Sequence, residues 1–210
     1  MGFETPLTIQ DAISRIYRRQ YLLPAIQREF FWSKDQIELL FDSLLRGYPI
    51  GSFLFWAVPM EQVHEYQYYE FVRNYHELNH RHNEKADVKG EEGITAVLDG
   101  QQRLSALYIG LKGSYAEKLK YKARHLKENY PETKLYLNIL KAASQSDGSV
   151  TGSTEKLYDF RFLTKHPASA GTHWFEVGKV LDWKDLTAVL NYVSENGFAQ
   201  LDTVCEAVRD

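Results

Sequence analysis

A short apolar run, residues 94–98, leads directly into the pentapeptide Asp99-Gly100-Gln101-Gln102-Arg103, and a stretch with helical spacing of apolar residues follows as far as Leu111. The run predicts a buried strand, and the spacing of Leu104, Leu107 and Leu111 predicts a helix. A strand that turns within a few residues into a helix limits the chain to folds that mix both elements. The fold class predicted is therefore α/β (α+β), with a small mixed sheet, surrounding helices and a helical C-terminal part.

Other segments predict further elements of both kinds. Thr8 and Ser33 are typical N-caps of two helices, and Gly47 ends the second of them. Buried strands are predicted over residues 53–58 and 94–98, and further strands over 135–140, 158–162 and 174–177. Residues 115–129 are rich in lysine and predict a helix, residues 142–154 predict a flexible loop, and residues 183–196 and 199–209 predict two more helices.

The pentapeptide lies where the predicted strand turns into the predicted helix, and this position suggests an anion site. The N-terminus of a helix presents backbone N–H groups and the positive end of the helix dipole, and Gly100 lets the backbone approach a ligand closely. Arg103 can bind phosphate oxygens through its guanidinium group, and Asp99 can cap the helix, hold a metal ion or polarise a water molecule. The alternative is purely structural: Asp99 caps, Gly100 eases the turn and Arg103 pairs with a surface acid.

Three groups of residues, in this order along the chain, resemble the N-terminal domain of GmrSD-type modification-dependent restriction proteins. They are Pro24-Ala25-Ile26-Gln27-Arg28-Glu29-Phe30-Phe31-Trp32, Asp42-Ser43-Leu44-Leu45-Arg46-Gly47-Tyr48-Pro49-Ile50-Gly51 and Val97-Leu98-Asp99-Gly100-Gln101-Gln102-Arg103-Leu104-Ser105-Ala106-Leu107. The resemblance implies a ParB/sulfiredoxin-like nucleotide-binding domain over residues 1–141. Residues 142–210 would form a strand-plus-helix extension of that domain, in a chain truncated before further domains.

The resemblance also implies a function, namely binding and hydrolysis of a nucleoside triphosphate with Mg²⁺, coupled to sensing or cleavage of DNA, possibly modified DNA, in restriction or phage defence. Asp99, Gln102 and Arg103 would be catalytic, and Asp99 would hold Mg²⁺ through the nucleotide. The nuclease would lie in a missing domain or a partner chain. The residues expected to bind the nucleotide are Gln27, Arg28, Gly51, Ser52, Gly100 and Gln101.

Charge adds one candidate surface. The formal net charge is −3, which by itself does not indicate a nucleic-acid-binding protein. Basic residues are nevertheless concentrated between Lys112 and Lys127, directly after the predicted motif helix. Either this is a solvated helix face or it contacts DNA phosphates, and the residues assigned to DNA are Lys118, Lys120, Lys122 and Arg124.

Two further features bound the interpretation. His76-Glu77-Leu78-Asn79-His80 matches the zinc-protease pattern, but polar neighbours favour an exposed segment over a catalytic helix. Cys205 is the only cysteine, so no disulfide forms within the chain, and no signal peptide or membrane-spanning run is visible. A cytoplasmic location without membrane contact is expected.

The leading hypothesis is thus an NTP-hydrolysing module of a DNA-restriction protein. The alternative is a non-catalytic DNA-binding or regulatory module that uses the same anion site. The two hypotheses differ in whether Asp99→Ala abolishes nucleotide turnover while DNA binding survives.

Overall fold

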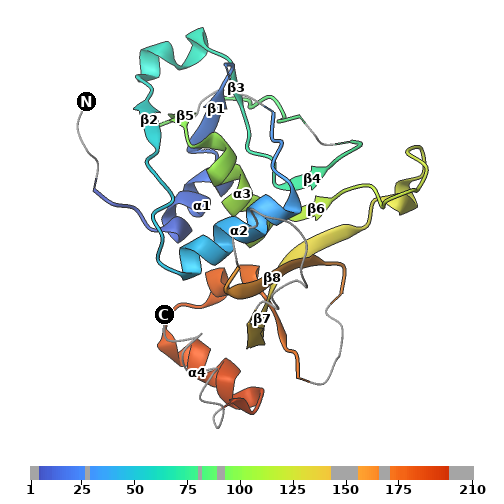
Figure 1. Cartoon of the computed structure of the whole chain (residues 1–210). Helices are drawn as coiled ribbons and strands as arrows, with labels where there is room; N and C mark the ends of the chain where they lie inside the picture. Colours follow the sequence, from blue (N-terminus) through green and yellow to red (C-terminus); the bar gives the residue numbers. More distant parts are fainter. Residues whose placement is uncertain are drawn as a thin grey trace. The chain divides into compact units, whose positions relative to one another are not determined.

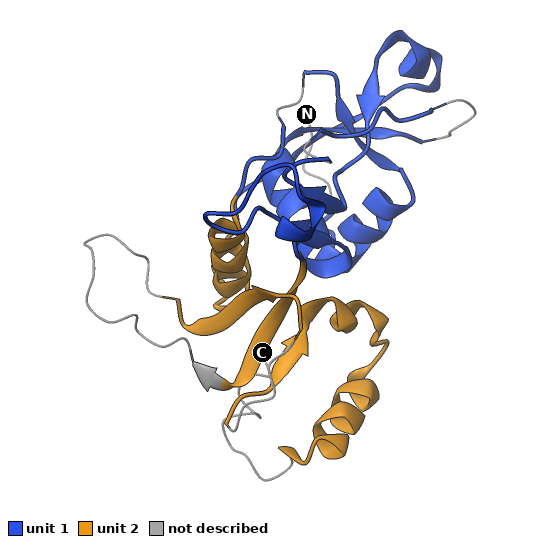
Figure 2. Cartoon of the chain, turned by 90° about the vertical axis from the view of Figure 1, so that its right-hand side faces the viewer, with its two compact units in different colours: residues 1–32, 51–131 blue, residues 33–50, 132–210 orange. Residues whose placement is uncertain are grey.

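The computed structural model describes residues 5–26, 29–79, 82–88, 93–142, 156–165 and 171–198, and these form two compact units. Unit 1 comprises residues 1–32 and 51–131, and unit 2 comprises residues 33–50 and 132–210, so each unit is built from two separate stretches of chain (Figure 2). The predicted α+β fold class is confirmed, because both units contain helices and paired strands. The domain division predicted at residue 141 stays a prediction.

Unit 1 contains a sheet with strand order β2-β5-β1-β3, labelled in Figure 1. β1 runs parallel to β5, whereas β2 pairs antiparallel with β5 and β3 antiparallel with β1. A parallel pair of strands, β4 and β6, lies elsewhere in the unit. The helices and strands of unit 1 are α1 (Ile9–Tyr17), β1 (Tyr21–Pro24), β2 (Leu54–Ala57), β3 (Tyr68–Tyr69), β4 (Asn74–His76), β5 (Thr95–Asp99), α3 (Gln101–Lys112) and β6 (Ser114–Ala116), with 3₁₀ turns at Met60–Glu65 and Lys127–Asn129.

The core of unit 1 surrounds the motif helix. Every residue of α3 from Leu104 to Leu111 is buried, so this helix is covered on all sides and not only along the predicted apolar stripe. β5 lies in the interior of the sheet, with Ala96 and Val97 fully buried. The turn between β5 and α3 is therefore held from both sides by buried elements.

β2 differs from the sequence prediction. Residues 53–58 were expected to form a buried strand, but the side chains of β2 are exposed or half-buried, and Leu54 is 41% exposed. β2 occupies the edge of its sheet, where only one neighbouring strand is present. The prediction that residues 53–58 form a buried strand is therefore wrong with respect to burial.

Unit 2 is built on β7, which pairs antiparallel with β8 and with β9. Its elements are α2 (Lys34–Leu45), β7 (Glu132–Ala142), β8 (Tyr158–Leu163), β9 (Trp174–Glu176), a 3₁₀ helix (Val177–Asp182) and α4 (Leu186–Glu195). The predicted caps Thr8 and Ser33 are both confirmed, and Ser33 forms a reciprocal capping box with Gln36. The helix predicted over residues 199–209 and most of the loop predicted over 142–154 lie outside the described residues.

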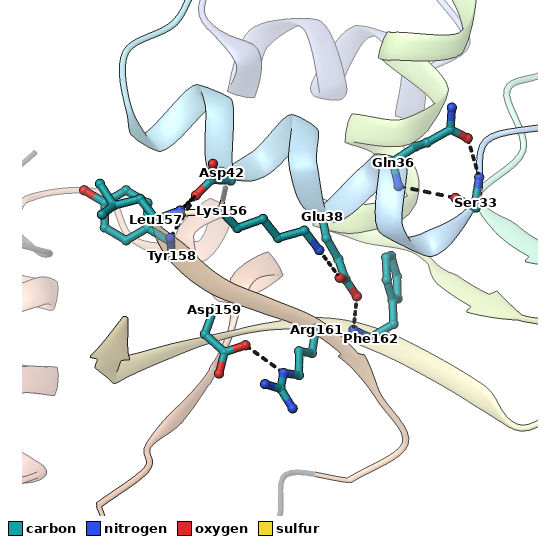
Figure 3. A network of polar contacts seen from close by, with 10 residues as sticks. All are labelled: Ser33, Gln36, Glu38, Asp42, Lys156, Leu157, Tyr158, Asp159, Arg161 and Phe162. Atoms are coloured by element: carbon teal, nitrogen blue, oxygen red, sulfur yellow. Dashed lines mark hydrogen bonds and ion pairs between the residues drawn. The ribbon is translucent and has the colours of Figure 1, made fainter. Parts of the chain in front are cut away.

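Two acids of α2 fasten this helix to β8 (Figure 3). Asp42 is completely buried, and its Oδ1 accepts hydrogen bonds from the backbone N–H groups of Leu157 at 2.9 Å and Tyr158 at 2.8 Å. Glu38 accepts one from the N–H of Phe162 at 3.1 Å and pairs with Lys156 at 2.8 Å. The side chains of α2 thus bind the backbone N–H groups of Leu157, which directly precedes β8, and of Tyr158 and Phe162 within it.

Within the described part of the chain, no helix is both long and apolar enough to cross a membrane.

Candidate functional site

The turn between β5 and α3 depends on Gly100. This residue is the N-cap of α3 and has φ +84° and ψ 9°, in the left-handed region that L side chains rarely adopt. A Cβ atom at this position would also collide with the ring of Phe53. The N-cap is Gly100 and not Asp99, so the alternative in which Asp99 caps the helix is wrong, and Gly100 itself offers no side-chain cap.

Gln101 and Gln102 bond backbone groups on two different segments. The Nε2 of Gln101 donates to the carbonyl oxygen of Val97 in β5 at 2.8 Å. The amide of Gln102 donates to the carbonyl of Glu29 at 2.9 Å and accepts from the N–H of Phe31 at 3.2 Å. Gln102 therefore pairs with residues 29–31 much as a neighbouring strand would.

Arg103 contacts the segment that precedes β2. Its Nη2 donates to the carbonyl of Ser52 at 2.7 Å and lies 3.6 Å from Oδ2 of Asp99. The guanidinium group also covers the ring of Phe53, 4.7 Å from its centroid. Gly51, with φ +85°, leaves room for it, because a Cβ there would overlap Nη1 of Arg103.

The pentapeptide thus brings together the end of β5, residues 29–31 and residues 51–53. The predicted nucleotide-binding residues Gly51 and Ser52 lie beside Arg103 through these contacts. Gln27 and Arg28 lie outside the described residues, directly before the segment that Gln102 binds. The sequence prediction placed Gln27 and Arg28, Gly51 and Ser52, and the pentapeptide in one site; the structure brings Gly51 and Ser52 to Arg103.

Asp99 presents the exposed acid of this site. Its side chain is 70% exposed, whereas that of Arg103 is only 22% exposed. A carboxylate that is open to solvent beside a helix start suits a magnesium ion bound mainly by phosphates, since Mg²⁺ commonly takes one or two protein carboxylates and keeps other ligands. The residues present are therefore compatible with the predicted Mg²⁺–nucleotide complex.

The lysine-rich segment is not the predicted helix. Residues 114–116 form β6, which pairs with β4 and buries Tyr115, and turns follow up to the 3₁₀ helix at Lys127–Asn129. The helix propensity of this segment was outweighed here, because its start pairs with β4, a strand remote in sequence. The predicted DNA-binding residues Lys120, Lys122 and Arg124 are exposed in this loop, and Lys118 is half-buried.

The zinc-protease pattern does not form the helix that such a site needs. His76 ends β4, and residues 77–79 form a turn; His80 lies outside the described residues. The Nδ1 of His76 accepts hydrogen bonds from the N–H groups of Leu78 at 3.2 Å and Asn79 at 3.4 Å. Glu77 instead binds the N–H of Lys118 at 2.8 Å. The described part of the pattern, residues 76–79, is therefore not helical.

Sequence reasoning missed the part played by Glu38 and Asp42. Both looked like ordinary polar positions of an amphipathic helix, yet both are buried and bonded to β8. Asp42 lies in the second motif quoted for the family resemblance, which was the available signal. An acid at a helix position that lies next to the apolar face could have indicated a buried partner.

Two comparisons with known proteins bear on the site. The family model described as the GmrSD restriction endonuclease, N-terminal domain, matches residues 9–175, well over half of the chain. The uncharacterized protein MJ0686 of Methanocaldococcus jannaschii is 33% identical over 101 residues. That stretch is 48% of this chain but only 16% of the relative, so the match covers a small part of the relative's length.

Proposed function

The chain belongs to the family of GmrSD restriction endonuclease N-terminal domains, and from this premise we propose that the β5–α3 turn binds and hydrolyses a nucleoside triphosphate in a DNA-restriction or phage-defence protein. The single observation that carries the proposal is the uncapped start of α3 at Gly100, with Asp99 and Arg103 beside it.

The turn has the chemistry of a phosphate site. The N–H groups that open an α-helix have no partner within the helix, and the dipole of the twelve-residue α3 favours negative charge at this end. Gly100 itself is buried against the ring of Phe53, so a phosphate group would approach the helix start from the side of the half-buried Gln101. Gly100 and Gln101 would supply these backbone contacts.

The side chains of the site would take the remaining catalytic and binding roles. Arg103 would neutralise charge that develops on the transferred phosphoryl group, and Gln102 would orient the attacking water. Asp99 would hold Mg²⁺ together with the phosphates; the ion would supply charge neutralisation when bound. Gly51 and Ser52, next to Arg103, and Gln27 and Arg28, before Glu29, would complete the nucleotide pocket.

Hydrolysis would be coupled to DNA, modified DNA included. The exposed residues Lys120, Lys122 and Arg124, together with Lys118, would contact DNA phosphates. Cleavage itself would reside in another domain or in a partner chain. We place the whole protein in the cytoplasm.

Phosphate release tests the proposal. The wild-type chain, Asp99→Asn and Arg103→Lys are incubated with ATP, GTP, CTP or UTP and Mg²⁺, with and without DNA. Asp182→Asn, which changes an exposed acid of unit 2, is the matched control. We expect both site variants to lower the rate at least 100-fold and the control to leave it unchanged. Equal rates in all four proteins would refute the assignment.

A specific observation favours a second candidate, a non-catalytic DNA-binding or regulatory module. Gln102 and Arg103 both bond backbone carbonyls, as residues with a structural role do. In that case Asp99→Asn would leave nucleotide and DNA affinities intact, and the wild type would release no phosphate from any nucleotide.

A further inference from the structure

The loop after β6 carries one fully exposed aromatic side chain among positive charges. Tyr121 is 101% exposed, more than any other large apolar side chain in the described part of the chain. Between residues 118 and 127 the sequence has five basic residues and no acid. A chain of net charge −3 therefore has one short segment in which an aromatic ring and cations are presented together.

The loop is built by buried side chains and has a definite shape. Asn129 is buried; its Nδ2 donates to the carbonyl of Ala123 at 2.9 Å, and its own carbonyl accepts from the N–H of Leu119 at 2.8 Å. The hydroxyl of the buried Tyr130 donates to the carbonyl of Arg124 at 3.1 Å. These bonds fasten the base of the loop on both sides of Tyr121.

The backbone at Tyr121 supports a role for the exposed ring. Its φ is +64°, a left-handed conformation that is uncommon for a residue with a large side chain. Glycine or asparagine would adopt it at lower cost, so a structural turn does not require tyrosine here. Strained conformations that the surrounding structure enforces are often found at binding sites.

We propose that this loop is a DNA-binding surface in which Tyr121 stacks on an unpaired base while Lys120 and Lys122 hold the adjacent phosphates. Base–aromatic stacking combined with flanking cations is the usual way in which proteins bind single-stranded nucleic acid. The choice of DNA rests on the proposed role in restriction, but the surface does not require nucleotide hydrolysis.

DNA with a single unpaired base tests this surface. The probe is a duplex with one bulged 2-aminopurine, compared with the fully paired duplex, a single-stranded RNA and vesicles of phosphatidylserine and phosphatidylcholine. The variants of the full chain are Tyr121→Gly, which relieves the backbone, Tyr121→Phe, which keeps the ring, and Lys120→Gln/Lys122→Gln. The control is Tyr66→Ala, which removes a half-exposed tyrosine of the same unit.

We expect the wild type to prefer the bulged duplex and to change the fluorescence of 2-aminopurine. Tyr121→Gly should weaken binding to the bulge roughly 5- to 150-fold, with an unchanged salt dependence, and Tyr121→Phe should bind like the wild type. The double lysine variant should reduce the salt dependence for paired and bulged DNA alike.

Three outcomes would overturn the proposal: equal affinity of Tyr121→Gly and wild type for the bulge, no DNA binding by the wild type, or a preference for RNA or for vesicles. Phosphate release without DNA reports on the nucleotide site and should not change in Tyr121→Gly. A failure of the proposed nucleotide hydrolysis is thus distinguishable from a failure of this surface.

Discussion

At the scale of single residues, two glycines decide how Arg103 and the turn are arranged. Gly51 and Gly100 both have positive φ, and each faces a side chain that a Cβ would overlap. Gly93 also has positive φ, at +72°, but nothing lies within 4 Å of the position of its Cβ. Gly93 therefore shows the need for glycine that comes from the left-handed backbone alone. Gly51 and Gly100 show in addition the need that comes from the lack of room for a Cβ atom.

We predict that Gly100→Ala lowers the free energy of unfolding more than Gly93→Ala does. Gly93→Ala should cost about 1–2 kcal/mol, from the left-handed backbone. Gly100→Ala should cost about 1–3 kcal/mol beyond that, because its Cβ meets the Phe53 ring. Urea unfolding of both variants measures the difference, and equal losses would mean that Phe53 moves aside without cost.

At the scale of elements, the attachment of α2 to β8 depends on buried acids. Asp42 and Glu38 lie one helical turn apart and bind three backbone N–H groups, those of Leu157, Tyr158 and Phe162 (Figure 3). Aromatic packing between Phe41 and Phe160, with ring centroids 5.9 Å apart, supports the same contact. These contacts thereby attach a helix to a strand that is distant in sequence.

We predict that Asp42→Ala destabilises the protein by about 2–5 kcal/mol, because two part-buried backbone N–H groups lose their acceptor. Asp35→Ala, at an exposed position of the first turn of the same helix, should cost at most about 1 kcal/mol. Chemical denaturation compares the two. If both variants unfold alike, the buried bonds of Asp42 do not stabilise the unit.

Glu38 makes the same attachment dependent on pH. Burial raises the pKa of this carboxyl, although the hydrogen bond and charge of Lys156 oppose the shift. The folded protein therefore retains the proton more strongly than the unfolded chain. The resulting stabilisation is complete below the ordinary pKa of 4.5 and is lost as pH rises through the folded pKa.

Glu38→Gln should remove this dependence. We expect the wild type to lose stability relative to the variant as pH rises above 4.5, and the difference to become constant once the carboxylate is fully ionised. Urea unfolding at a series of pH values gives the difference directly. A wild type that gains stability over the variant with rising pH would indicate a lowered pKa instead.

Helices and strands were predictable from sequence to different degrees. Thr8 and Ser33 marked helix starts because their side-chain oxygens accept N–H groups close in sequence. Residues 115–129 were assigned to a helix wrongly, because the pairing of Tyr115 with Tyr75 in β4 involves a strand remote in sequence. Helix propensity depends on residues close in sequence and therefore cannot indicate pairing with a remote strand.

At the scale of the whole molecule, the distribution of charge is more informative than its sum. The chain carries 25 basic and 28 acidic residues, so its net charge opposes association with DNA. The loop with Tyr121 carries five basic residues between positions 118 and 127. We therefore expect DNA binding to be dominated by this local surface.

The affinity of the whole chain for DNA should therefore fall steeply with salt. Four or five phosphate contacts predict a slope of about −3.6 to −4.5 for duplex DNA in a plot of log K against log salt concentration, and the double lysine variant should make the slope shallower by about 1–2. Lys179→Gln, at an exposed position of unit 2, should not alter the slope. A slope near zero for the wild type would exclude binding through these cations.

The sequence by itself determined the α+β fold class, the strand–glycine–helix turn and the membership in a family of restriction endonuclease domains, because these depend on local periodicity, on backbone conformation and on motifs read in order. Only the tertiary structure decided that Gln102 and Arg103 bind the backbone of residues 29–31 and 52, that Asp42 is buried against β8, and that Tyr121 is exposed. The hydrogen bonds depend on partners that lie far away along the chain. The exposure of Tyr121 depends on the absence of any described segment that covers it. The chemistry of a side chain determines which hydrogen bonds and ion pairs it can form. The tertiary structure determines which of these it forms.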